Sequence, residues 1–296
     1  MDRKQSEEWQ SRVSRTVNSA ACFSLAYVLI NYMMWIVTGL VGRLFKFDTF
    51  VYYYGVKMIL NGQVWDKTKI AAVYSAGPLF ALFAALLCLF LYRRLRKIRT
   101  LLNVFLLWVF VIGIGIFLSH LIIAALGIYR YNSYYYQGFA VTFAWLKVPK
   151  FLVYLINVFV AVFIVYFGTN VGRLFLVFSY SYSKVNNLLK RRKYFFETAI
   201  APFIVGALIS TVAVFPKDKA ALGVLVLLAA THIIYFAVIG MILAVGSFSL
   251  AYIEISRPEL VRYKSLQTPN VFFVLFMIIA WVYIYITFRG VYFSSM

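Results

Sequence analysis

Residues 70–127 read IAAVYSAGPLFALFAALLCLFLYRRLRKIRTLLNVFLLWVFVIGIGIFLSHLIIAALG. Two long apolar runs flank a short connector that contains Arg93, Arg94, Arg96, Lys97 and Arg99, and the second run carries no charge. A bilayer accepts two such runs as a helical hairpin, and basic connectors stay on the cytoplasmic side. The stretch therefore predicts a membrane hairpin whose basic tip lies in the cytoplasm.

The composition of the whole chain agrees with a membrane protein. Of the 296 residues, 64% are hydrophobic and 13% are charged, whereas ordinary globular chains have about 45–50% and about 25%. The net charge is +20, but the basic residues cluster in short connectors between apolar runs. This distribution favours anionic lipid headgroups over nucleic acid as the counter-charge, because there is no basic soluble domain.

The apolar runs predict an all-α, polytopic transmembrane helical bundle. We expect about seven spans, which together form a single transmembrane domain covering residues 20–296. Residues 1–19 are expected to be a cytoplasmic N-terminal tail, amphipathic or loosely ordered. The predicted spans are 20–42, 70–92, 101–127, 151–172, 198–215, 221–251 and 270–288.

A different pattern occupies the connector between the first two spans. Asn61-Gly62 lies between the apolar-rich segments Val51 to Leu60 and Val64-Trp65. Asn-Gly between such flanks is a strong signal for a tight turn. We therefore predict a small extracytoplasmic β-hairpin near residues 50–66. A helix lying in the membrane interface would explain the same aromatic residues.

The charge pattern also predicts orientation and location. The two densest basic clusters fall on the same side of the predicted membrane, which places the N-terminus in the cytoplasm and the C-terminus outside it. The first apolar run has no small-residue cleavage site after it, so we expect a retained anchor in a bacterial inner membrane. The residues expected to contact anionic headgroups are Arg93, Arg94, Arg96, Lys97, Arg99, Lys190, Arg191, Arg192 and Lys193.

Two histidines lie inside predicted spans, at similar depths. His120 belongs to the third span and His232 to the sixth. Ionisable groups within a membrane suggest a function by default. The pair could ligate a haem or relay protons, and together with Asn157 it could line a transport path. The simpler interpretation is that each neutral imidazole forms a hydrogen bond with a neighbouring helix.

No catalytic or metal-binding constellation is recognisable in the sequence. Cys22 and Cys88 lack the spacing of a disulfide framework or zinc site. No acidic residue lies in the middle of a predicted span, and Glu254 is the nearest. Ser210 stands in an apolar span without the Gly-x-Ser-x-Gly context of a nucleophile. The sequence therefore predicts no catalytic residue and no metal.

The segment Ala72 to Leu91, which contains Ser75-Ala76-Gly77-Pro78-Leu79, resembles the Ala-Gly-Pro helix of site-2-type intramembrane metallopeptidases. It also resembles uncharacterised bacterial membrane proteins that keep this helix without the catalytic residues. This chain has neither His-Glu-x-x-His nor a later Asn-Pro-Asp-Gly. The resemblance implies a non-proteolytic relative that holds or presents another membrane protein, and no catalytic role carries over.

Together these observations favour a non-catalytic, membrane-embedded scaffold or accessory subunit. The first alternative is a transporter or channel-like protein that uses His120 and His232. The second is a membrane electron carrier in which the two histidines ligate haem b.

Overall fold

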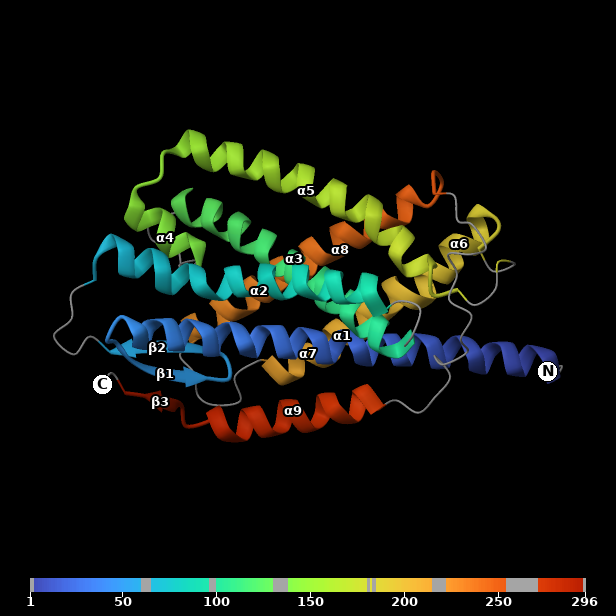
Figure 1. Cartoon of the computed structure of the whole chain (residues 1–296), viewed down its shortest axis with the longest axis horizontal. Helices are drawn as coiled ribbons and strands as arrows, with labels where there is room; N and C mark the ends of the chain where they lie inside the picture. The colour runs from blue at the N-terminus through green and yellow to red at the C-terminus, as the bar shows by residue number, and fades with distance from the viewer. Residues whose placement is uncertain are drawn as a thin grey trace.

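A computed structural model describes residues 3–59, 65–95, 100–129, 138–179, 182, 185–214, 222–253 and 271–294. In it, long helices run back and forth along one axis and a small sheet lies at the C-terminal end (Figure 1). The helices are α1 (Arg3–Leu44), α2 (Lys67–Leu95), α3 (Thr100–Tyr129), α4 (Phe139–Leu146), α5 (Lys150–Leu176), α6 (Leu188–Phe195), the π-helical turn η2 (Phe196–Ile200), α7 (Ala201–Val214), α8 (Leu222–Ser249) and α9 (Val271–Thr287).

Six helical segments of the described chain are long and apolar enough to cross a membrane, as the sequence predicts. They are Arg12–Leu44, Lys67–Leu95, Leu101–Gly127, Lys150–Leu176, Leu188–Val214 and Val226–Ser249. The predicted seventh span corresponds to α9, which has 17 residues and is therefore near the lower limit for a spanning helix. An all-α, multi-pass bundle is confirmed.

The start of the chain differs from the prediction of a separate tail. Residues 3–19 are helical and continue without a break into the first span, so that α1 is 42 residues long. The segment contains no proline, and its first glycine is Gly39, so nothing in the backbone interrupts the helix before its last turns. The loosely ordered alternative was therefore wrong.

The fifth span also begins earlier than predicted. The helical path starts at Leu188 and continues through α6 and η2 into α7, so the basic cluster at 190–193 is part of the helix. Asn187 caps this helix, because its side-chain oxygen accepts a hydrogen bond from the Lys190 backbone N–H at 2.9 Å. A helix start placed at residue 198 was wrong for this reason.

The predicted hairpin exists, with a different turn. Strand β1 (Asp48–Tyr52) pairs antiparallel with β2 (Gly55–Ile59), and Tyr52 lies opposite Gly55. The turn therefore contains Tyr53 and Tyr54, and not Asn61-Gly62, which lies outside the described residues.

A third strand, β3 (Val291–Phe293), completes a sheet in the order β2-β1-β3. Sequence analysis did not predict it. The Tyr292 hydroxyl donates to the Asp48 carboxylate at 2.8 Å, and this bond raises the pKa of the tyrosine above its ordinary value. The pairing ties the end of the chain to the connector after α1.

Glycines set how closely the elements approach one another. The sheet packs against the end of α1 at Gly39, where an added Cβ would lie 2.6 Å from Val51 of β1. In the bundle, a Cβ on Gly113 of α3 would lie 2.5 Å from the backbone oxygen of Ala81 in α2. Small residues at such contacts are typical of packed membrane helices.

Gly113 provides a test of this packing. Gly113→Ala should lower the stability of the purified protein by about 1–3 kcal/mol, because a backbone atom limits the space. Gly240→Ala is the matched control, since its Cβ would meet only Phe203 at 3.6 Å. Thermal unfolding in detergent measures both, and equal melting temperatures would contradict the close approach of α2 and α3.

Candidate functional site

The predicted histidine His120 lies in the core of the bundle and pairs with a tyrosine. Its Nε2 is 2.7 Å from the hydroxyl of Tyr235 on α8, and both residues are buried. The two ring centroids are 5.4 Å apart. This contact joins α3 to α8 in the interior.

The second histidine, His232, pairs with a tyrosine of a third helix. Its Nδ1 is hydrogen-bonded to the hydroxyl of Tyr27 on α1. The ring of Tyr235 also stands edge-on to His232, with centroids 5.6 Å apart. Tyr27, His232, Tyr235 and His120 therefore form a continuous series, here called the His–Tyr chain, across α1, α8 and α3.

The surroundings of the His–Tyr chain are closely packed. Phe236 stacks on Tyr27 with ring centroids 4.9 Å apart. Gly138, which precedes α4 and has φ of +53°, lies against His120, and a Cβ there would be 2.5 Å from His120 Nδ1. That nitrogen has no hydrogen-bond partner within the described part of the chain. It is the one open position of an otherwise paired imidazole.

The geometry limits what the His–Tyr chain can do. A haem bond to His120 Nε2 or His232 Nδ1 would replace a tyrosine contact. The described residues contain no group of three His, Cys, Asp or Glu side chains that could hold a metal ion. Asn157 of α5 donates to Val153 of its own helix at 2.9 Å, and no contact joins it to the histidines. The predicted path through Asn157 is therefore not assembled among these residues.

Sequence reasoning missed the two tyrosines. Tyr235 follows His232 by three residues, which places both on one face of α8. This spacing was a usable signal for Tyr235. Tyr27 lies in an apolar run that gives no sign of its partner, so only the packing of α1 against α8 reveals it.

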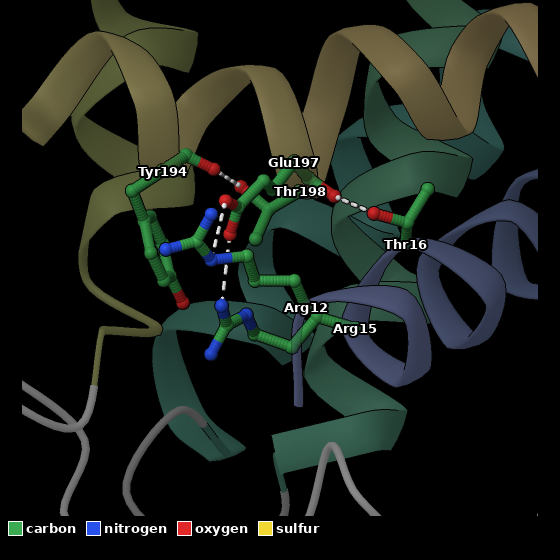
Figure 2. A network of polar contacts seen from close by, with 6 residues as sticks. All are labelled: Arg12, Arg15, Thr16, Tyr194, Glu197 and Thr198. Carbon is green, nitrogen blue, oxygen red and sulfur yellow. Dashed lines mark hydrogen bonds and ion pairs between the residues drawn. The ribbon is translucent and has the colours of Figure 1, made fainter. Parts of the chain in front are cut away.

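A second polar cluster lies where α1 meets the start of α7, as Figure 2 shows. Arg15 is almost fully buried, and one of its guanidinium nitrogens is 2.8 Å from the Glu197 carboxylate. Arg12 is 3.6 Å from the other carboxylate oxygen, and Arg15 lies over the ring of Tyr194 at 5.8 Å. Two cations on one carboxylate tie the first helix to the fifth predicted span.

The π-helical turn η2 makes this cluster possible. A π turn widens the helix and leaves backbone carbonyls available for other donors. Thr16 of α1 donates to the carbonyl of Glu197 at 2.9 Å, and Ser19 donates to that of Thr198 at 2.6 Å. Trp108 of α3 in turn donates to the Ser19 hydroxyl at 2.9 Å. Three helices are joined at this point.

Glu197 was overlooked because it stands just before the predicted start of the span at 198. The sequence-based statement that Glu254 is the nearest acidic residue to a span was wrong, since Glu197 is inside the helical path from Leu188 to Val214. Glu254 lies outside the described residues. The available signal was a lone acid followed by a long apolar run.

Arg191, predicted to contact lipid headgroups, has internal partners. Its guanidinium donates to the carbonyl of Val185 at 2.8 Å and to those of Leu250 and Ile253, just after α8. A cation at the end of a helix satisfies free carbonyls and complements the helix dipole. Lys190, Arg192 and Lys193 remain exposed.

No family model, no curated protein and no solved structure matches this chain. The similarity to site-2-type metallopeptidases therefore stays an expectation that rests on Ala72 to Leu91. The residues described above must carry the functional argument.

The His120–Tyr235 contact predicts a measurable loss. Tyr235→Phe should reduce the free energy of unfolding by about 1 kcal/mol, because buried His120 loses its partner at Nε2. Tyr285→Phe is the control, since Tyr285 is 74% exposed. Denaturant titration in detergent compares the two variants, and an unchanged midpoint for Tyr235→Phe would refute the contact.

The Glu197 cluster predicts a larger effect. Glu197→Leu should destabilise the protein by about 3 kcal/mol, since it leaves the buried Arg15 guanidinium without its carboxylate. Arg15→Leu combined with Glu197→Leu should recover part of this loss. The same unfolding measurement decides, and additive losses in the double variant would show that the ion pair does not form.

Proposed function

We propose that this multi-pass protein resides in a bacterial inner membrane with its N-terminus in the cytoplasm. The basic side chains support this orientation. Arg93 and Arg94 at the end of α2 and the exposed Lys190, Arg192 and Lys193 of α6 occupy the same end of the bundle as the N-terminus (Figure 1). These residues are suited to anionic headgroups, which attract basic segments next to the membrane.

We further propose that it acts as a non-catalytic scaffold or accessory subunit for another membrane protein. One observation carries this proposal: ionisable side chains inside the bundle are used to join its own helices. His120 pairs with Tyr235, His232 with Tyr27, and Glu197 with Arg15. Groups used in this way fix the shape of the bundle and are not free to turn over a substrate.

The resemblance of Ala72 to Leu91 to the Ala-Gly-Pro helix points in the same direction. It suggests a relative of the membrane metallopeptidases that lacks His-Glu-x-x-His and keeps a capacity to hold a membrane partner. A rigid framework suits this role, because a partner then meets a surface that needs no reordering.

A transporter or channel-like function is the second candidate. The continuity of the His–Tyr chain favours it, as does the open Nδ1 of His120. Imidazole and phenol groups in series can pass protons. A haem electron carrier remains the third alternative, and it requires both histidines to exchange their tyrosine partners for iron.

The double variant His120→Gln, His232→Gln separates these functions. Wild type and variant are purified without loss of the membrane fraction, reconstituted in liposomes loaded with a pH-sensitive dye, and given a proton gradient. The scaffold proposal predicts equal, background dye responses and a colourless wild-type sample.

A cellular cross-linking experiment supplies the positive evidence. The scaffold proposal predicts a stoichiometric membrane partner cross-linked to both wild type and double variant. Proton flux present in wild type and absent from the variant would overturn it in favour of transport. A Soret band lost in the variant would overturn it in favour of a haem protein.

A further inference from the structure

A buried amide in α1 has unmet hydrogen-bonding capacity. Asn31 has no exposed surface, and neither its Nδ2 nor its Oδ1 has a partner among the described residues. The indole Nε1 of Trp35, four residues later on the same face, is also buried and unpartnered in the described chain. Two donors and an acceptor are thus directed into the protein interior.

A third unmet group lies on α7. Ser210 is fully buried, and its hydroxyl has no hydrogen-bond partner in the described ranges. Ser210 follows Gly206 by four residues, so both share a face of α7. That face is turned toward α1, because a Cβ on Gly206 would lie 2.4 Å from the ring of Phe23.

Contacts on either side place these groups at one level of the bundle. Ser24 of α1 donates to the carbonyl of Gly206 at 3.3 Å, and Tyr32 donates to that of Ala213 at 3.1 Å. Ser210 lies between these two carbonyls along α7, as Asn31 lies between Ser24 and Tyr32 along α1. Asn31 and Trp35 follow Ser24 by about two and three helical turns, on nearly the same line.

From this placement we infer that the seam between α1 and α7 contains a binding site for a small neutral ligand that both donates and accepts hydrogen bonds. A buried amide, hydroxyl and indole without partners are unfavourable in an apolar bundle, and a bound ligand removes that cost. The amide of Asn31 offers donor and acceptor, whereas Ser210 and Trp35 supply further donors. Water is the smallest ligand with this chemistry, and an alcohol or a carboxamide presents the same groups.

The neutral character of the ligand follows from distance to the nearest charges. Along α1, Arg15 and Arg43 are about 24 Å and about 18 Å from Asn31 at 1.5 Å per residue. On the α7 side, Glu197 is about 20 Å from Ser210 by the same measure. With no counter-charge near, the site disfavours an ion.

High-resolution cryo-electron microscopy of the full chain in lipid nanodiscs tests the inference. The expected result is density within hydrogen-bonding distance of Asn31 and Ser210. Density of one atom's size identifies water, and larger density identifies an organic solute that denaturing mass spectrometry of the same sample then finds. Both support the site. A map in which Asn31 and Ser210 bond to each other or to backbone, with no added density, overturns it.

A stability measurement gives an independent answer. If a ligand satisfies the amide, Asn31→Leu should lower the melting temperature by several degrees, because these hydrogen bonds are lost. If the amide were empty, the apolar side chain should raise the melting temperature, which would refute the site. Asn157→Leu is the matched control, since that amide bonds only within its own helix.

Discussion

The packing of the bundle depends on polar contacts made by α1. Between helices in lipid, apolar faces gain little from association, because lipid tails are as apolar as leucine; hydrogen bonds and close packing must supply the energy. Along α1, Thr16 and Ser19 bond to η2, Tyr27 bonds to α8, and Tyr32 bonds to α7. Tyr32 also stacks on Tyr283 of α9 with ring centroids 3.7 Å apart.

These contacts explain why α1 is long. Residues 12–19 would be an ordinary cytoplasmic extension if they only continued the helix. Instead, Arg15 and Thr16 reach the π turn, and the Ser19 hydroxyl receives a hydrogen bond from Trp108 of α3. At its other end, the glycines of α1 accept the sheet that includes the last strand of the chain. One helix therefore joins both ends of the bundle.

The spans were predictable because hydrophobic length alone determines which segments can cross a bilayer. The hairpin was predictable in its existence, but not in its turn: Asn61-Gly62 was the stronger local signal, whereas pairing of Tyr52 with Gly55 and burial of Tyr53 placed the turn earlier. Local sequence also did not reveal that residues 3–19 and 188–197 would be helical, since tertiary contacts with Glu197 and Ser19 stabilise both.

The candidate site shows the same division. His120 and His232 stood out as rare ionisable residues in apolar runs, and the bundle brings both into contact with Tyr235. Their partners come from helices that are distant in sequence, so no spacing rule could pair Tyr27 with His232. Glu197 was hidden for a similar reason, because its significance comes from an arginine 182 residues away.

The central claim is that the buried ionisable groups act as ties between helices. A double-mutant cycle of Tyr27→Phe and His232→Leu, measured as unfolding free energy in detergent, tests it most directly. The account predicts a coupling energy of at least about 0.6 kcal/mol, the usual value for hydrogen bonds between membrane helices. Additive effects of the two substitutions would contradict it, because the contact would then contribute nothing to the bundle.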